Sequence, residues 1–99
     1  MSDLCKEINK FGKGIGNEHR YRMLQALIKG PRTVNELVDI IKLSQPAISQ
    51  HLRTLKESDL VTDERKGQEV YYSLNTEHTL SLLTALVKDI EKSRNRSKK

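Results

Sequence analysis

The chain has 99 residues, of which 35% are hydrophobic, so the sequence predicts one domain with a small core rather than several domains. No apolar run approaches the roughly 18 residues that a membrane-spanning helix needs, and nothing resembles a secretion signal, so a cytoplasmic protein is expected. The formal net charge of +5 favours nucleic acid as a partner, but its distribution weakens that argument. Five of the 18 basic residues lie in the last eight positions, and the 13 that remain are balanced by 13 acidic residues.

Cys5 is the only cysteine in the sequence. A single thiol excludes a disulfide within the chain and a thiol-rich metal centre formed by one chain. A structural or incidental cysteine is the preferred interpretation. The alternative is an oxidant sensor in which two copies of Cys5 approach each other across a dimer.

Two amphipathic helices are predicted at the start of the chain. The first spans about residues 4–11, where Leu4, Ile8 and Phe11 share one helical face. The glycines of residues 12–16 are expected to break this helix and to act as a flexible joint. They lack the spacing and the preceding strand of a phosphate-binding loop.

Asn17 is predicted to cap the second helix, because a side-chain oxygen at this position accepts a hydrogen bond from a first-turn amide. The Gly-Pro pair at residues 30–31 is predicted to end it. Its predicted buried stripe consists of Tyr21, Leu24, Leu27 and Ile28. His19, Arg20 and Arg22 are predicted to point away from this stripe, where they either contact phosphates or hydrate the outer face.

Residues 33–60 carry two helix-length apolar patterns separated by a short polar break, and the rest of the chain is interpreted as their scaffold. The first pattern has the i, i+3, i+4, i+7 spacing of one helical face and consists of Val34, Leu37, Val38 and Ile41. The second repeats this arrangement with Ile48, Leu52 and Leu55. Ser44 is predicted to cap the second helix, and Pro46 is tolerated in its first turn, where amides have no intrahelical partner.

The outer face of this second helix carries the candidate functional residues. With the apolar side chains turned inward, it presents Gln45, Ser49, Gln50 and Arg53 outward or on one flank. Short hydroxyls, amides and a cation are the groups that contact base edges and phosphates in a major groove. The alternative is the ordinary polar face of a soluble helix. The preceding helix, the tight turn and the following hairpin favour the DNA interpretation.

Residues 60–62 and 70–74 are rich in β-branched and aromatic residues and flank a Lys-Gly-Gln turn, so they predict a two-stranded hairpin. Such a hairpin is stable when it packs on helices. Its tip carries Arg65, Lys66 and Gln68, which suit a wing that lies against the phosphate backbone or the minor groove. The alternative is an ordinary solvated turn.

The last helix is predicted to run from about Thr76, capped by Asn75 or by Thr76 itself, to about Ser93. Its apolar residues are Leu80, Leu82, Leu83, Leu86, Val87 and Ile90. This surface exceeds what a terminal helix of a small domain buries on one side, so we expect a homodimer in which this helix packs on its symmetry mate and on the first helix. The predicted organisation is one domain over residues 1–93 and a basic, disordered tail over residues 94–99.

The order of these elements and the runs LSQPAISQHLRTLKESDLV and GQEVYYSL resemble the ArsR/SmtB family of winged-helix repressors over roughly residues 11–91. The predicted fold class is mainly α with a small β-hairpin, a winged helix-turn-helix that dimerises through its first and last helices. The resemblance implies that each subunit places one recognition helix in a major groove of an inverted-repeat operator in double-stranded DNA. The implied DNA contacts are Ser44, Gln45, Pro46, Ser49, Gln50 and Arg53 in the recognition helix, and Lys66 and Gln68 in the wing.

The inducer sites of that family carry over poorly to this chain. Val38 and Ile40 stand where the resemblance implies metal-binding cysteines, and neither side chain binds a soft metal. The positions of a second family site hold Thr76, His78, Asp89 and Lys92. His78 is retained there and Asp89 is a weaker candidate ligand, so two such pairs across a dimer would give four zinc ligands. The preferred interpretation is that no metal or other cofactor binds, because a lysine replaces a carboxylate.

The leading functional hypothesis is a dimeric, sequence-specific DNA-binding transcriptional regulator, a repressor released by a signal that the sequence does not identify. The alternative is a protein-interaction module that has the winged fold and no sequence-specific DNA binding, which the neutral body of the chain favours. An enzyme is not expected, because His19, His51 and His78 lie in separate elements without a nucleophile or paired-carboxylate motif.

Overall fold

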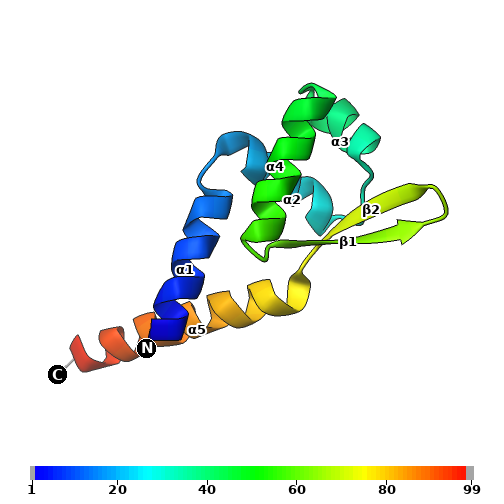
Figure 1. The fold of residues 1–99 in the computed structure, drawn as a ribbon. Helices are drawn as coiled ribbons and strands as arrows, with labels where there is room; N and C mark the ends of the chain where they lie inside the picture. The colour runs from blue at the N-terminus through cyan, green and yellow to red at the C-terminus, as the bar shows by residue number, and fades with distance from the viewer. Residues whose placement is uncertain (1, 98–99) are drawn as a thin grey trace.

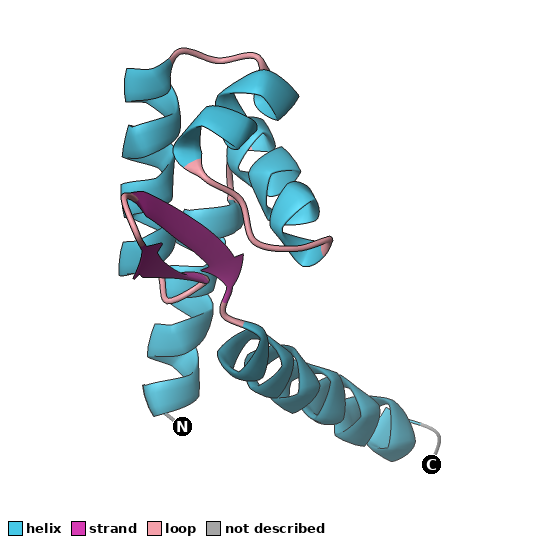
Figure 2. Cartoon of the chain, turned by 90° about the vertical axis from the view of Figure 1, so that its right-hand side faces the viewer, coloured by secondary structure: helices cyan, strands magenta, loops and turns pink. Residues whose placement is uncertain are grey.

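In the computed structural model, which describes residues 2–97, the chain forms five helices and one two-stranded hairpin (Figure 1). The elements are α1 (Ser2–Ile15), α2 (Glu18–Ile28), α3 (Val34–Ile41), α4 (Gln45–Glu57), β1 (Val61–Lys66), β2 (Glu69–Leu74) and α5 (Thr76–Ser97). Helices α2, α3 and α4 pack together and α1 packs on α4, whereas α5 leaves the hairpin and extends away from the body (Figure 2). Among the described residues, no helix combines the length and the apolar character needed to span a bilayer.

The hydrophobic core lies between α2, α3, α4 and the start of β1. Its buried residues are Met23, Leu24, Ala26, Leu27, Leu37, Ile41, Ile48, Leu52, Leu55, Leu60 and Val61. The predicted inward face of α4 is confirmed, because Ile48 and Leu55 are fully buried and Leu52 is 2% exposed. Each such aliphatic side chain stabilises the fold by about 1.5–3 kcal/mol relative to an exposed one.

The buried face of α2 differs from the predicted one. Tyr21 is 49% exposed and Ile28 is 66% exposed, whereas Met23 and Ala26 are buried. Both the predicted and the observed stripe include Leu24, because neighbouring faces overlap on a helix that turns about 100° per residue. Spacing alone leaves the choice between these faces open, and the packing of α3, α4 and β2 against α2 decides it.

Helix α1 continues through Gly12 and Gly14 to Ile15, so the predicted break and flexible joint at these glycines are wrong. A Cβ atom at Gly14 would lie 2.7 Å from the Cβ of Ser58 and 2.8 Å from a methyl carbon of Leu60, closer than packed side chains approach. Glycine therefore lets α1 pack closely on the end of α4. That contact compensates for the low helix propensity of glycine, which costs about 1 kcal/mol per residue relative to alanine.

Arg20 of α2 holds the end of α1 in place. Its Nε donates to the carbonyl oxygen of Gly14 at 2.6 Å, and its Nη2 donates to the carbonyl oxygen of Lys13 at 3.0 Å. These carbonyls lie in the last turn of α1, where backbone acceptors lack helical partners and positive charge is favourable. Arg20 is therefore a structural residue, which the sequence pattern did not indicate.

The hairpin pairs β1 and β2 antiparallel in one continuous register. Gly67 and Gln68 form its turn, and Gly67 has a φ of +65°, a left-handed value that glycine adopts without strain. Arg32 and Tyr72 exchange backbone hydrogen bonds of 2.9 and 2.8 Å, which tie β2 to the loop before α3. The predicted hairpin is confirmed, and it is anchored to the helical body.

Helix α5 extends to Ser97, four residues beyond the predicted end near Ser93. Arg94 and Arg96 lie in its last turn, where positive side chains interact favourably with the carbonyl end of the helix. That interaction explains the longer helix where a disordered tail was predicted. Residues 98–99 of the predicted tail lie outside the described residues.

Apolar side chains of α5 remain exposed in the single chain. Leu82 is 5% exposed, whereas the exposed fractions of Leu80, Val87 and Ile90 are 61%, 52% and 59%. An apolar surface of this kind marks a binding surface more often than a solvated face. The predicted excess of apolar surface on this helix is therefore present.

Candidate nucleic-acid interface

Two capped helices and a tight turn set the direction of α4. The hydroxyl oxygen of Thr33 accepts from the amide of Glu36 at 3.2 Å, and the amide of Thr33 donates to the Glu36 carboxylate at 2.9 Å. Lys42 follows α3 in the left-handed conformation, with a φ of +69°, and redirects the chain. Ser44 then caps α4 as predicted, because its Oγ accepts from the amide of Ala47 at 3.3 Å.

The exposed face of α4 carries the predicted recognition residues. Every predicted DNA contact is exposed: Ser44, Gln45, Pro46, Ser49, Gln50, Arg53, Lys66 and Gln68. Gln45, Ser49 and Arg53 follow one another at four-residue intervals, so they form a nearly straight line about 12 Å long. The opposite side of α4 is in the core, which holds this line of side chains outward.

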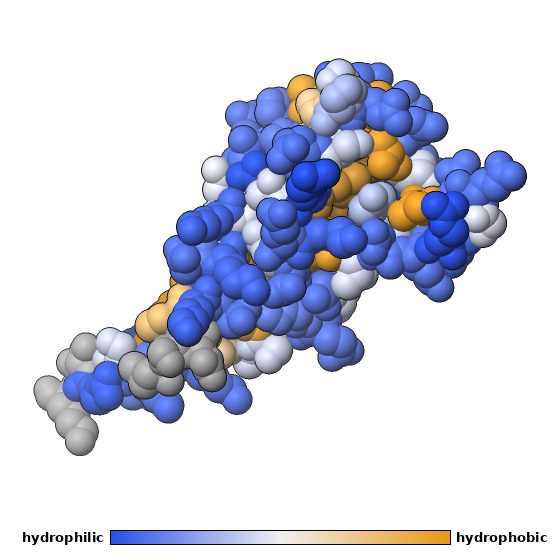
Figure 3. Space-filling model, viewed as in Figure 1, coloured by the Kyte–Doolittle hydropathy of each residue, from blue (hydrophilic) through white to orange (hydrophobic). Residues whose placement is uncertain are grey.

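An open groove with a volume of about 530 Å³ runs between α4 and the hairpin. It is lined by Ser49, Leu52, Arg53, Lys56, Glu57 and Tyr72. In Figure 3, hydrophilic residues cover most of this side of the molecule, and apolar residues surface mainly between α4 and the hairpin. Tyr72 and Lys56 are groove residues that were absent from the predicted contacts. Strand alternation was the available signal for Tyr72, because it shares a strand face with the core-packed Leu74.

The wing carries its charges on two faces. Asp63 and Arg65 share one face of β1. That face is turned toward α4, since Nζ of Lys56 in α4 donates to Oδ2 of Asp63 at 3.0 Å. Both partners are partly exposed, so this pair stabilises the hairpin by less than about 1 kcal/mol. On the other face, the Lys66 ammonium lies 5.7 Å from the centre of the Tyr71 ring, within the range of a cation–π interaction. The tip therefore presents cations on both sides.

His51 lies on the flank of α4 that faces α2. Its Nδ1 is 3.4 Å from Nη1 of Arg20, and its ring centre is 6.1 Å from that of His19. Burial lowers the pKa of His51, and the nearby charges of Arg20 and His19 lower it further. His51 is therefore neutral at pH 7, and its Nδ1 accepts from the guanidinium, because arginine carries donors and no acceptor. The contact links α4 to the end of α1 through one arginine.

The two candidate metal ligands do not meet within one chain. His78 and Asp89 are both on α5 and are separated by three helical turns, or about 16 Å. Asp89 is exposed, whereas His78 is half-buried with its Nε2 at 3.3 Å from Oε1 of Glu7. A site that joins His78 to Asp89 therefore requires a second chain.

Comparison with known proteins agrees with this geometry. Residues 17–63 match the family described as "Bacterial regulatory protein, arsR family". The chain is 39% identical over 69 residues to the transcriptional repressor SdpR of Bacillus subtilis. The aligned region covers 70% of this chain and 77% of SdpR. It is 44% identical over 59 residues to the transcriptional repressor SmtB of Mycobacterium tuberculosis. This aligned region covers 60% of this chain and only 44% of SmtB.

Solved structures show the same fold. The structure of NolR from Sinorhizobium fredii is 31% identical with a TM-score of 0.71, and the match covers 88% of this chain and 87% of NolR. A homodimeric winged helix-turn-helix DNA-binding domain of a possible ArsR-family regulator from Mycobacterium bovis is 27% identical with a TM-score of 0.74, covering 94% of this chain and 85% of that one. The predicted winged helix-turn-helix fold is thereby confirmed. The chain belongs to the ArsR family of bacterial regulatory proteins and is a DNA-binding transcriptional regulator.

Proposed function

We propose that this chain is a homodimeric transcriptional repressor that binds an inverted-repeat operator in the cytoplasm and is released by a signal not yet identified. The observation that carries the proposal is the line of Gln45, Ser49 and Arg53 on a helix whose other side is buried in the core. A line of about 12 Å corresponds to three or four base pairs at about 3.4 Å each. Amide and guanidinium side chains form bidentate contacts with adenine and guanine, so this face suits a major groove.

The proposed dimer uses α1 and α5. The exposed apolar residues of α5 supply a surface that a second copy covers in an isologous interface. The structural neighbour from Mycobacterium bovis is described as homodimeric, which supports the formation of a dimer. A twofold axis would present two copies of α4 to successive major grooves, which is why the proposed operator is an inverted repeat.

Selection of bound DNA from a random pool, followed by gel shifts of the selected site across a salt series, tests the proposal. We expect an inverted-repeat sequence to be enriched and a duplex with scrambled half-sites to bind at least about 1,000-fold more weakly. A variant of the full chain with Lys92, Arg94 and Arg96 replaced by glutamine is expected to retain this preference. If it loses all DNA binding, the chain is a protein-interaction module whose cationic terminal turn binds DNA without sequence preference.

Lys66→Ala is expected to weaken binding to the operator and to scrambled DNA by the same factor, because a phosphate contact carries no sequence information. The slope of log K against log salt concentration should become less steep by about 1 per subunit. Gel shifts or fluorescence anisotropy at several salt concentrations measure both effects. Lys29→Ala, which removes an exposed lysine at the end of α2, is the matched control and should leave the slope unchanged. A selective loss of operator affinity in Lys66→Ala would contradict the phosphate assignment.

A further inference from the structure

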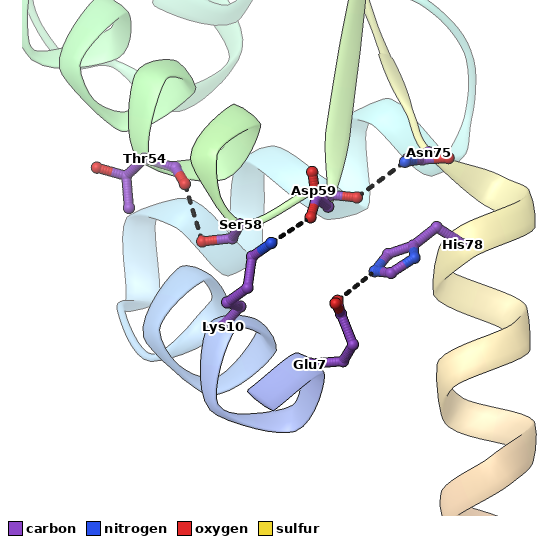
Figure 4. A network of polar contacts seen from close by, with 7 residues as sticks. All are labelled: Glu7, Lys10, Thr54, Ser58, Asp59, Asn75 and His78. Carbon is purple, nitrogen blue, oxygen red and sulfur yellow. Dashed lines mark hydrogen bonds and ion pairs between the residues drawn. The ribbon is translucent and has the colours of Figure 1, made fainter. Parts of the chain in front are cut away.

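Three metal-ligating side chains meet where α1, the turn between α4 and β1, and α5 come together (Figure 4). They are Glu7, Asp59 and His78, and one potential ligand atom from each lies within 4.8 Å of the others. The three residues are far apart in the sequence and are brought together by the fold. All three residues are partly buried, and the side chains of His78 and Glu7 are 29% and 37% exposed.

The His78–Glu7 pair already has the spacing of two metal ligands. Nε2 of His78 is 3.3 Å from Oε1 of Glu7. Two ligand atoms at about 2.1 Å from a tetrahedral zinc ion are about 3.4 Å apart. Oε1 of Glu7 is buried, and apart from this ion pair with His78 it has no hydrogen-bond partner among the described residues. A buried carboxylate oxygen with no well-aligned hydrogen bond is unfavourable, and a cation between this oxygen and the imidazole would satisfy it.

Contacts within the chain already fix the position of Asp59. Its backbone is left-handed, with a φ of +63°, and its carbonyl oxygen accepts from Nδ2 of Asn75 at 3.0 Å. Oδ2 of Asp59 accepts a hydrogen bond from Lys10 of α1. Two carboxylates and one ammonium give a net charge of −1, so the cluster attracts a divalent cation.

We propose that Glu7, Asp59 and His78 bind one divalent ion of the zinc type per chain. One imidazole nitrogen and two carboxylate oxygens suit zinc, and the absence of a thiolate from this trio disfavours soft ions such as Cu(I). Water completes the coordination. This site lies within a single chain and does not use Asp89, so it differs from the paired site across a dimer that the sequence suggested. The proposal stands independently of DNA binding.

Calorimetric titration of zinc into the chelator-treated, full-length protein tests the site. We expect one ion per chain and a rise in Tm of at least about 5 °C at zinc concentrations well above Kd, because the ion joins three elements of the folded state. Glu7→Gln and His78→Gln should each weaken zinc binding at least tenfold. Lys10→Gln should bind zinc at least as tightly as the parent, because it removes a competing cation from Asp59 and leaves the three ligands in place.

Two further variants separate this site from others in the same chain. Asp89→Asn and Cys5→Ser should leave zinc affinity and stoichiometry unchanged, and circular dichroism confirms that each variant is folded. The proposal is overturned if the parent binds no zinc, if Asp89→Asn or Cys5→Ser abolishes binding, or if Glu7→Gln and His78→Gln both bind as tightly as the parent. Binding that both of these variants lose and both controls retain supports the proposal.

Discussion

Ile48→Ala is expected to lower the free energy of unfolding by about 2–5 kcal/mol, because it leaves a cavity at a fully buried position in the centre of α4. A loss of this size is a large share of the roughly 5–15 kcal/mol that stabilises a typical domain. Urea denaturation followed by circular dichroism measures it. The protein concentration must be the same for all variants, since dimer formation would make the apparent stability depend on it.

Two variants in the same helix control for this result. Ile48→Val removes one methyl group and should cost about 0.5–1.5 kcal/mol. Gln50→Ala changes an exposed side chain and should alter the free energy of unfolding by less than about 0.5 kcal/mol. Equal stability of Ile48→Ala and Gln50→Ala would mean that α4 does not turn its apolar side into the core.

The double variant Gln45→Ala, Ser49→Ala is expected to bind the selected operator about 30- to 1,000-fold more weakly. This corresponds to about 2–4 kcal/mol, since each good contact between a side chain and a base contributes about 1–3 kcal/mol of discrimination. Both side chains are exposed, so the fold should be unaffected. Fluorescence anisotropy with the selected duplex and with a scrambled duplex gives the two affinities.

Binding of this double variant to scrambled DNA should remain within about twofold of the parent, because the phosphate contacts are retained. Gln25→Ala is the matched control, since it removes an exposed glutamine from α2 instead of α4. An operator affinity equal to that of the parent would show that this face of α4 does not read the sequence. Equal losses for both duplexes would indicate a backbone contact instead.

The recognition helix was predictable because its signals are local. The spacing of Ile48, Leu52 and Leu55 defines which side is buried, and the cap at Ser44 defines where the helix begins. The hairpin was predictable for the same reason, since Gly67 stands at a turn position that needs a left-handed backbone. Contacts with bases stay predictions, because exposure of a side chain does not identify its partner.

Other features depend on contacts between distant residues and were not predictable. Gly14 is a weak helix former, and its place inside α1 follows from the neighbouring Ser58, which lies 44 positions later in the chain. Tyr21 has the spacing of a core residue, yet it is exposed because α3 and α4 cover the adjacent face of α2. The meeting of Glu7 with His78 likewise depends on how α1 and α5 cross, which no local pattern encodes.

The close contact at Gly14 fixes how near α1 lies to Ser58 and Leu60. Glu7 lies seven residues before Gly14, or about 10 Å away along the helix axis. A side chain at position 14 would collide with Ser58 and Leu60 and would push α1 away from them. If α1 tilted by about 10° around position 14, Glu7 would be displaced by about 2 Å. The absence of a Cβ atom at Gly14, near one end of α1, thus helps to set the distance between Glu7 and His78 near the other end.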